Sequence, residues 1–305
     1  MNNNSTPTLT IVTPTYNRSQ MLRACWKSLK DQTNNDFQWL VIDDGSEDNT
    51  RQVIEKFMAE APNMCIDYYF KENGGKHTAL NFSHKYIKGK YVLILDSDDM
   101  LTPDAVEIVI SSWRKYDYDT SVNVIYFYRK NKNGETLCHV KNTNSVIYTY
   151  KEKRISKLHS RDCCDTFRSE TFIKFVFPVF SNERFIWEGA AFLEIELLGK
   201  GVYIDRAIYV CDYLENGLTK QGRKMRLSNP CGGRFNSNVY MNRKLSFSTR
   251  IKNAVLYVCY SHFAGASIRR MYLETDYRGI MTVCLIPGTL LYFYWKRRYF
   301  SNANG

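Results

Sequence analysis

Residues 90–99 read KYVLILDSDD, an apolar run that ends in three aspartates. The run has the length of a β-strand, and the acidic residues mark its end. Asp96 and Asp98 stand two positions apart on one loop, so both can reach a divalent cation, and Mg²⁺ and Mn²⁺ prefer carboxylate oxygens. An acidic turn before a helix fits equally well, because residues 102–104 (TPD) supply a cap, a first-turn proline and a first-turn acid.

A second acidic stretch, VIDDGS at residues 41–46, also ends an apolar run and begins a helix-length segment. The expected strands are Leu9–Thr13, Phe37–Ile42, Cys65–Phe70 and Tyr91–Leu95, and the expected helices between them are Ser19–Lys30, Glu47–Met58 and His77–Tyr86. This alternation predicts an α/β fold with a mostly parallel central sheet flanked by helices. Ligands of such sheets bind outside the carboxyl ends of the strands. We therefore expect residues 13–18, 43–46, 73–77 and 96–99 to line one crevice.

Composition places the chain among ordinary globular proteins. It has 305 residues, of which 44% are hydrophobic and 24% charged, enough for one large domain or for a domain with an appendage. Its nine cysteines are scattered without a C-x-x-C pair, which indicates a reducing compartment and no structural zinc. Residues 1–10 are polar and lack the layout of a signal peptide, so we expect the catalytic part to lie in the cytoplasm.

The positive charge is concentrated in the C-terminal third. The formal net charge is +11, and the segment from Lys220 onward holds 15 Lys and Arg residues against only Glu274 and Asp276. Basic and acidic residues nearly balance in the rest of the chain. This uneven distribution argues against nucleic acid as a partner and directs attention to the C-terminal segment.

That segment contains an apolar, aromatic run, GIMTVCLIPGTLLYFYW at residues 279–295, followed directly by KRR. The run is short for a spanning helix and Pro287-Gly288 interrupts it, so an interfacial or re-entrant position suits it better. We expect residues 221–305 to form a basic, helical, membrane-associating region that includes a helix over residues 244–263. The protein would then be peripheral or monotopic on the inner face of the cell membrane. A buried amphipathic helix with a basic end is the alternative.

Four motifs in order resemble glycosyltransferase family 2. They are TPTYNR at residues 13–18, DDGSEDNT at 43–50, NGGKHTALN at 73–81 and DSDDMLTPD at 96–104. The resemblance covers residues 8–110 firmly and thins toward residue 220. It implies the GT-A fold over residues 1–220, with a nucleotide-sugar-binding half at about 8–110 and an acceptor-binding half at about 111–220. It also implies a nucleotide-sugar donor and a divalent cation, Mn²⁺ or Mg²⁺.

Each loop can supply one part of a nucleotide-sugar site. Asp43 can accept a hydrogen bond from the imide N–H of a base, Tyr16 offers a ring face for stacking, and glycine at 74 and 75 permits close backbone approach. Lys76 and His77 could contact phosphate oxygens, although this stretch also fits a plain loop and helix start. The expected donor-binding residues are Thr13, Pro14, Tyr16, Arg18, Asp43, Asp44, Asn73, Gly75, Lys76, Asn81, Asp96, Lys220 and Arg223.

The resemblance assigns the metal to the aspartates of residues 96–99. Asp98 is expected to ligate the cation directly, Asp96 to lie near the ribose or the cation, and Asp99 to support them. Lys220 and Arg223 follow the last expected strand, in a loop that could close over the donor and hold the departing diphosphate. A solvated basic loop explains these two residues equally well.

Inverting transfer by direct displacement needs a carboxylate to accept the proton of the acceptor hydroxyl. Glu188 is the candidate, because it begins a helix ahead of an expected strand at Val202–Ile208, where the family commonly carries Glu-Asp. Here Gly189 replaces the second acid. A glutamate that only favours the helix N-terminus is the alternative reading, and Asp165 and Glu183 are lesser candidates for the base.

These observations predict an inverting hexosyl- or N-acetylhexosaminyl-transferase. It would move a sugar from a nucleoside-diphosphate carrier, UDP above others, to a polyprenyl-diphosphate-linked glycan in bacterial surface-polysaccharide synthesis. A nucleotidyltransferase also uses paired carboxylates and a metal, but no Gly-rich basic triphosphate loop stands near the N-terminus. A dehydrogenase is disfavoured because no G-x-G-x-x-G follows the first strand. A non-catalytic membrane-associated nucleotide-sugar-binding module is the remaining alternative.

Overall fold

The computed structural model describes residues 6–137, 144–149, 163–211 and 218–300. The chain divides into two compact units. The first, here called the sheet unit, comprises residues 1–177 and 195–212, and the second, the helical unit, comprises residues 178–194 and 213–305. The acidic stretches at residues 43–44 and 96–99 lie in the sheet unit, whereas Glu188 lies in the helical unit.

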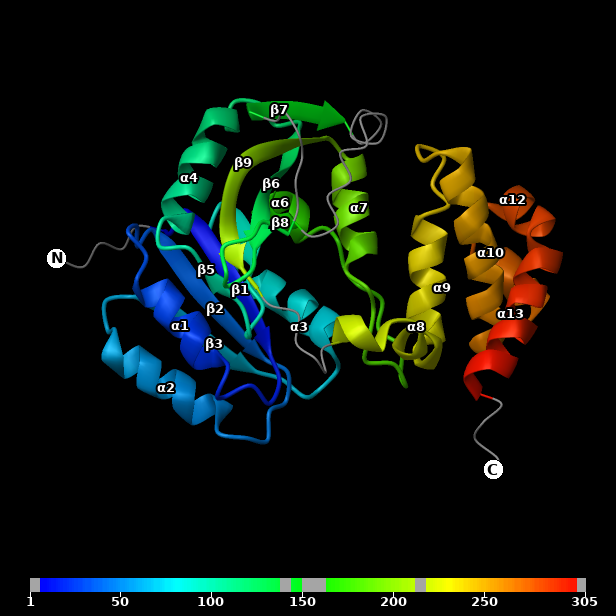
Figure 1. Ribbon diagram of the computed structural model, residues 1–305, viewed down its shortest axis with the longest axis horizontal. Helices are drawn as coiled ribbons and strands as arrows, with labels where there is room; N and C mark the ends of the chain where they lie inside the picture. The colour runs from blue at the N-terminus through cyan, green and yellow to red at the C-terminus, as the bar shows by residue number, and fades with distance from the viewer. Residues whose placement is uncertain (1–5, 138–143, 150–162, 212–217, 301–305) are drawn as a thin grey trace. The chain divides into compact units, whose positions relative to one another are not determined.

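In the part of the chain that the structure describes, the sheet unit holds one sheet of nine strands. Helices flank this sheet (Figure 1). The strands are β1 (Leu9–Thr15), β2 (Phe37–Asp43), β3 (Cys65–Phe70), β4 (Tyr91–Ile94), β5 (Met100–Leu101), β6 (Val122–Lys130), β7 (Asn144–Thr149), β8 (Cys163–Arg168) and β9 (Lys200–Val210). Their order is β3-β2-β1-β4-β8-β6-β9-β5, with β7 also paired to β9. All pairs among the first four strands are parallel, as predicted. The sheet becomes mixed beyond them, because β8 runs antiparallel to both β4 and β6.

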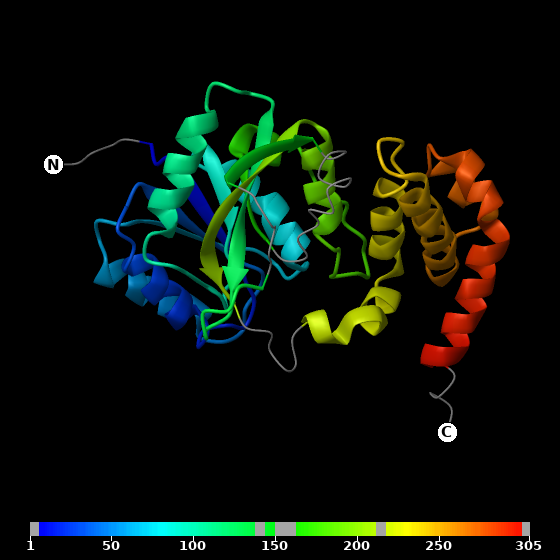
Figure 2. The ribbon, with the colours of Figure 1, turned by 45° about the horizontal axis from the view of Figure 1, so that its top comes forward.

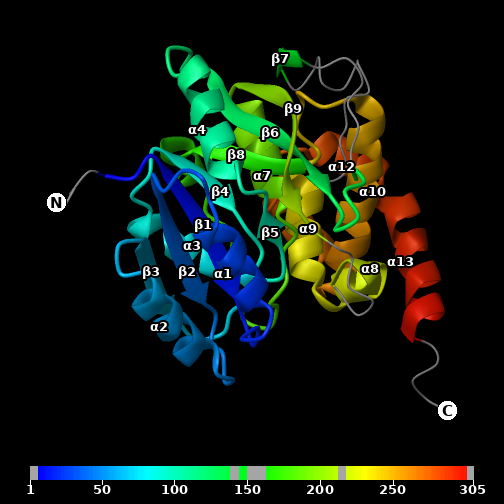
Figure 3. The same cartoon turned by 60° about the vertical axis from the view of Figure 1, so that its left-hand side comes forward.

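Helices cover both faces of this sheet (Figure 3). One core packs α1 (Leu22–Lys30), α2 (Thr50–Glu60) and α4 (Ala105–Tyr116) on the strand face that carries Ile11, Trp39 and Leu93. The apolar side chains of these helices recur at helical spacing, so each buries one stripe. Alternate strand residues face the other way, where α3 (Lys76–Ser83) and α6 (Ser169–Phe172) lie. The loops that follow β1, β2 and β4 therefore lie at the carboxyl ends of these strands.

The helical unit holds a bundle (Figure 2). Its helices are α8 (Leu218–Ser228), α9 (Pro230–Val239), α10 (Phe247–Phe263), α11 (Ile268–Leu273), α12 (Arg278–Val283) and α13 (Leu285–Phe300), while α7 (Gly189–Leu197) begins in this unit and ends in the sheet unit. The predicted run 279–295 is thus two helices that break at Cys284. None of the described helices is long and apolar enough to cross a membrane.

Pro287 and Gly288 lie in the first turn of α13, where a proline needs no hydrogen-bonded N–H. A Cβ on Gly288 would come 2.5 Å from Cβ of Val258, so the glycine lets α13 approach α10 closely. Trp295 lies two turns further along α13 on the same side. It is buried, and the centre of its ring lies 6.0 Å from that of Tyr260. One side of α13 is therefore packed against α10 and the opposite side is exposed.

Glu183, a lesser candidate for the base, has a structural role. Its Oε1 accepts from the backbone N–H of Cys231 at 2.7 Å and its Oε2 from that of Gly232 at 2.8 Å. The side chain is buried, and the first turn of α9 supplies both donors. A carboxylate at this position satisfies two unpaired N–H groups and favours the positive end of the helix dipole.

We expect Glu183→Ala to lower the free energy of unfolding by about 2 kcal/mol, because two buried N–H groups lose their acceptor. Chemical denaturation followed by circular dichroism measures this change. Glu170→Ala is the control, since Glu170 is an exposed first-turn acid of α6. Equal stability of the two variants would contradict the capping role.

Candidate functional site

The loop after β4 presents two of its aspartates and buries its other two residues. Asp96 and Asp98 are partly exposed, whereas Ser97 and Asp99 are buried. This alternation places the carboxylates of Asp96 and Asp98, two positions apart, on the accessible side. The loop is short because β5 (Met100–Leu101) resumes at once and pairs with β9.

Each accessible aspartate is paired with a cation from another loop. Nη1 of Arg18, which follows β1, lies 3.2 Å from Oδ2 of Asp98. Nζ of Lys76, at the start of α3, lies 2.5 Å from Oδ1 of Asp96. Three loops distant in sequence thus meet at the carboxyl edge of the sheet, which confirms the convergence of 13–18, 73–77 and 96–99. Two carboxylates and two cations lie within one small area.

The protonation behaviour of these aspartates differs. Burial raises the pKa of Asp96, but the charges of Lys76, Arg129 and Arg18 outweigh it and hold the pKa below its usual value. Burial and the neighbouring charge of Asp96 raise the pKa of Asp99 to about 7. Asp96 therefore stays ionised at neutral pH, while Asp99 is an interior group that titrates near neutrality.

Two residues that sequence reasoning missed support this loop. The hydroxyl of Tyr209 in β9 accepts from the backbone N–H of Asp96 at 3.0 Å and donates to Oδ2 of Asp99 at 2.8 Å. The guanidinium of Arg129, at the end of β6, lies 4.5 Å from the centre of the Tyr209 ring. Both residues come from the second half of the sheet unit. No local pattern in the sequence links them to the aspartates.

Asp44 organises the glycine-containing loop of the third motif. Its carboxylate accepts from Nζ of Lys71 at 2.5 Å and from the backbone N–H groups of Gly74 and Gly75 at 3.1 and 2.7 Å. A Cβ on Gly45, whose φ is +86°, would lie 2.6 Å from the backbone nitrogen of Asn73. The second and third motifs are therefore packed together, and Asp44 positions the loop that carries Lys76.

Asp43 is buried and fixed at the end of β2. Its Oδ1 accepts from the backbone N–H of Ser46 at 2.8 Å, and its Oδ2 accepts from the hydroxyl of Tyr68 at 2.7 Å. Tyr16 lies on the neighbouring loop with 43% of its surface exposed. Asn17 links the two loops, because its backbone N–H donates to Oγ of Ser46 at 2.8 Å. An acceptor and an accessible aromatic ring thus belong to adjacent loops.

Several predicted donor-binding residues make structural contacts within the sheet unit. Thr13 and Pro14 are buried within β1, and Oγ1 of Thr13 accepts from the indole N–H of Trp39 at 3.0 Å. The amide of Asn81 donates to the backbone oxygen of Phe177 at 2.8 Å and accepts from its N–H at 2.9 Å. These contacts show what holds the strand and α3 in place. Their part in donor binding stays a prediction.

The remaining predicted residues belong to the helical unit. Glu188 directly precedes α7, and its backbone oxygen accepts from Phe192 at 3.1 Å. The guanidinium of Arg223 lies 4.7 Å from the centre of the Trp295 ring. The side chain of Lys220, like residues 212–217 of the predicted closing loop, lies outside the described residues. The roles of Glu188 and Arg223 stay predictions.

His77, beside Lys76, is buried and has no hydrogen bond to either ring nitrogen among the described residues. Burial lowers its pKa from 6.5 to about 4. The unfolded chain therefore binds a proton that the folded chain excludes between these pH values, so the free energy of unfolding falls as pH drops from 6.5 toward 4.

We expect the lowered pKa of His77 to reduce the free energy of unfolding by about 2 kcal/mol at acidic pH. Urea denaturation at pH 7.5 and pH 4.5 measures it, and His77→Leu should reduce the difference between the two pH values by that amount. His84, whose pKa burial also lowers to about 4, keeps its own contribution. Lys85→Leu, a substitution at an exposed site, is the matched control. It should keep the full difference in the free energy of unfolding between the two pH values. An unchanged pH difference in His77→Leu would contradict the argument.

The described residues contain no group of three or more His, Cys, Asp or Glu side chains placed to hold a metal ion. Asp96 and Asp98 supply two accessible carboxylates. Mg²⁺ sites that serve phosphate substrates commonly use one or two protein carboxylates and complete the shell with phosphate and water oxygens. The oxygen-only donor set of this loop therefore fits a hard divalent cation that is shared with a substrate.

Comparison with known proteins agrees with this geometry. The model of glycosyl transferase family 2 matches residues 10–172, more than half of the chain. Chondroitin synthase from Escherichia coli is 32% identical over 165 residues, which cover 54% of this chain and 23% of that relative. S. aureus TarS 1-349 in complex with UDP-GlcNAc superposes with a TM-score of 0.61 at 19% identity, covering 92% of this chain and 79% of that chain.

The mannosyltransferase PcManGT from Pyrobaculum calidifontis, in complex with GDP-Man and Mn²⁺, gives a TM-score of 0.57 at 15% identity over 96% of this chain and 89% of that chain. At such identities the solved structures show the shared fold. This chain spans well under half the length of curated relatives such as chondroitin synthase. The family match covers all four strand-end motifs, and it shows that this chain belongs to glycosyltransferase family 2 and is a transferase enzyme.

Proposed function

We propose that this enzyme is an inverting glycosyltransferase that moves a sugar from a nucleoside-diphosphate carrier, UDP above others, to a glycan acceptor. The observation that carries the proposal is the meeting of Arg18 and Lys76 with Asp98 and Asp96 at one edge of the sheet. A diphosphate needs cations for its oxygens, and a bridging metal needs carboxylates. This site offers both within one small area, and the complexes of TarS and PcManGT with nucleotide sugars support the donor class.

Asp98 and Asp96 would hold the divalent cation, Mn²⁺ or Mg²⁺. When bound there, such a cation supplies Lewis-acid stabilisation of the charge that develops on the departing diphosphate. Arg18 and Lys76 would exchange their present carboxylate partners for phosphate oxygens, since a guanidinium and an ammonium both pair well with phosphate. Asp99 and Tyr209 would keep the loop in shape.

The nucleoside would lie over the ends of β1 and β2. Asp43, whose two oxygens already accept hydrogen bonds from Ser46 and Tyr68, would offer a remaining lone pair there, and the partly exposed ring of Tyr16 can stack on a base. A uracil offers an imide N–H that such an acceptor can bind. Asp44 would act indirectly, by holding the backbone of residues 73–75 against the second motif.

Glu188 would accept the proton of the attacking hydroxyl, so that attack and departure of the nucleoside diphosphate occur in one displacement with inversion. The bond from the sugar to the diphosphate breaks as the bond to the acceptor oxygen forms. The position of Glu188 before α7 supports this role, and no covalent intermediate is required.

A polyprenyl-diphosphate-linked glycan of bacterial surface-polysaccharide synthesis is the acceptor we propose, and the inner face of the membrane is the place. Four large side chains on one side of α13 support this: Ile286, Leu290, Phe293 and Tyr294 are 75, 64, 60 and 54% exposed. Their spacing puts them on one helical face, and Lys296, Arg297 and Arg298 follow at the basic end. An amphipathic helix of this kind lies in the interface of an anionic bilayer.

Sedimentation with vesicles tests the membrane proposal. We expect binding to vesicles that contain phosphatidylglycerol, and a loss of about 100-fold in Leu290→Glu/Phe293→Glu, because each side chain contributes roughly 1 kcal/mol of burial and each new carboxylate is repelled. Tyr118→Glu in the sheet unit is the control, since Tyr118 is 82% exposed. Equal vesicle binding by wild type and the double variant would contradict the membrane proposal.

Calorimetric titration with UDP and GDP tests the donor class. We expect UDP to bind in the presence of Mn²⁺ and to bind at least tenfold more weakly after chelation with EDTA, because the cation links carboxylates and phosphates. Tyr16→Ala should weaken UDP binding about tenfold, consistent with the loss of one base-stacking contact. Binding of neither nucleotide under any metal would contradict the proposed donor site.

A further inference from the structure

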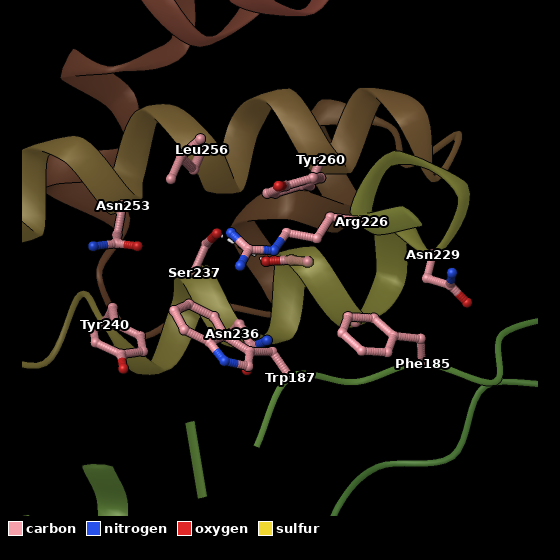
Figure 4. Close-up of a pocket in the computed structure, with 12 residues that line it drawn as sticks. Phe185, Trp187, Arg226, Asn229, Asn236, Ser237, Tyr240, Asn253, Leu256 and Tyr260 are labelled. Atoms are coloured by element: carbon pink, nitrogen blue, oxygen red, sulfur yellow. Dashed lines mark hydrogen bonds between the residues drawn. The ribbon is translucent and has the colours of Figure 1, made fainter. Parts of the chain in front are cut away.

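The helical unit contains a pocket that the donor site does not use (Figure 4). Its walls are aromatic, from Phe185, Trp187, Tyr240 and Tyr260, and its polar lining comes from amides, hydroxyls and Arg226. All of these residues belong to the helical unit. No acidic side chain belongs to the part of the lining that the structure describes.

Among the described residues that line this pocket, Arg226 alone is charged. Its guanidinium lies 4.6 Å from the centre of the Trp187 ring, and Figure 4 shows it pointing between Trp187 and Tyr260. Among the described residues the guanidinium of Arg226, an exposed side chain, has neither a hydrogen bond nor an ion pair. The hydroxyl of Tyr260, a side chain only 5% exposed, also has no hydrogen-bond partner in that part of the chain. A cationic guanidinium fork and a phenol are thus available as donors in an aromatic-lined pocket.

Two glycines of α9 shape the pocket. A Cβ on Gly233 would lie 2.8 Å from the ring of Tyr260, and one on Gly232 would lie 2.7 Å from the backbone oxygen of Phe185. Only the absence of side chains there lets α9 approach both neighbours. The aromatic walls are therefore held by close packing, which favours a pocket that is formed before a ligand arrives.

The pocket residues contact the chain on either side of the proposed base. Trp187 precedes Glu188 in the chain, and Gly189 follows it. The hydroxyl of Tyr240 donates to the backbone oxygen of Gly189 at 3.2 Å. Trp187 and Tyr240 stack with their ring centres 6.2 Å apart. With its amide correctly oriented, Asn236 pairs with both the N–H and the oxygen of Trp187. Residues of the pocket thus fix the backbone on both sides of Glu188.

We infer that this pocket is an acceptor subsite that binds a sugar carrying an oxyanion, either a phosphate or a carboxylate. Arginine pairs with both groups in a bidentate manner. Aromatic walls suit the apolar faces of a pyranose ring, and the amides and hydroxyls of the lining suit its hydroxyl groups. This inference rests on the proposed function, because a ligand held here would be an acceptor placed next to Glu188.

Direct binding tests the inference without turnover. Protein saturated with UDP and Mn²⁺, so that phosphate sites near Asp98 are filled, is titrated with N-acetylglucosamine 1-phosphate, methyl glucuronide, neutral methyl N-acetylglucosaminide and inorganic phosphate. We expect the two acidic sugars to bind at least tenfold more tightly than the neutral sugar. Preference for the phosphate sugar would identify a glycosyl phosphate, such as the lipid-linked diphosphate, and preference for the glucuronide would identify an acidic residue of the glycan.

Variants assign that binding to the pocket. Arg226→Gln should weaken binding of the acidic sugars at least tenfold and leave the neutral sugar unchanged, while Arg226→Lys should restore part of the difference. Lys224→Gln removes an exposed positive charge from the same helix and is the matched control. Equal binding of acidic and neutral sugars, no binding of any sugar, tightest binding of bare phosphate, or an Arg226→Gln variant that binds like wild type would each overturn the inference.

Failure of the proposed function has a different signature. In that case UDP does not bind, whether or not the titrated sugars bind. If UDP binds but binding of the acidic sugars does not depend on Arg226, only the inference of an acceptor subsite is wrong. The two results are obtained from the same samples.

Discussion

Asp98→Asn is expected to lower release of nucleoside diphosphate from the donor by about 1,000-fold, because a neutral amide is a poor ligand for a hard cation and the leaving group loses its electrostatic stabilisation. The fold should survive. The Arg18 and Asp98 side chains are 32 and 27% exposed, and an ion pair at such a site contributes about 1 kcal/mol or less. Loss of activity would then report on the site itself.

A readout besides turnover separates metal binding from other roles. Titration of Mn²⁺ in the presence of UDP should show at least tenfold weaker binding of the cation to Asp98→Asn than to wild type. Asp104→Asn is the control, since Asp104 follows on the same segment and its carboxylate accepts from the hydroxyl of Thr102 at 2.8 Å. Turnover by Asp98→Asn within a few-fold of wild type would show that Asp98 does not hold the cation.

Glu188→Gln is expected to slow donor turnover by about 1,000-fold, the range that loss of a general base produces. Binding of UDP should be unchanged, because the proposed donor contacts of Arg18, Lys76 and Asp96 lie in the sheet unit. A base at Glu188 would also activate water when no acceptor is present. Hydrolysis of the donor and calorimetric binding of UDP therefore measure the two expectations on one preparation.

Glu194→Gln provides the matched control on the same helix. Burial raises the pKa of Glu194, so an amide is tolerated there with little change in stability. Glu183→Ala is a second comparison, because it should destabilise α9 without the specific loss of turnover. If Glu188→Gln hydrolyses donor at the wild-type rate, the base must be another group.

The first half of the sheet unit could be predicted from the sequence because its signals are local. Strands β1 to β4 are short apolar runs, and the loops after them carry acids, glycines and a proline that mark each strand end. The predicted helix 77–86 corresponds to α3 followed by a single turn at His84–Tyr86. A resemblance spread over four ordered motifs added the family, which the family match confirmed.

The second half could not be predicted in the same way, because its contacts are distant in sequence. Tyr209 supports an aspartate loop that lies 113 residues earlier in the chain. No sequence pattern in either segment predicts this contact. The antiparallel insertion of β8 between β4 and β6 is also set by tertiary packing. Likewise, the run 279–295 has the composition of one membrane segment, but the fit of Gly288 against Val258 buries one side of α13.

Hydrolysis of a panel of nucleotide sugars by the purified protein, with Mn²⁺, Mg²⁺ or EDTA, tests the central claim most directly. Released nucleoside diphosphate is measured for each donor, beside Asp98→Asn. We predict metal-dependent release from a UDP-sugar, abolished by EDTA and lost in the variant. Absence of release from every donor under every metal, together with absence of nucleotide binding, would contradict the assignment of the loops after β1, β2 and β4 to a nucleotide-sugar site.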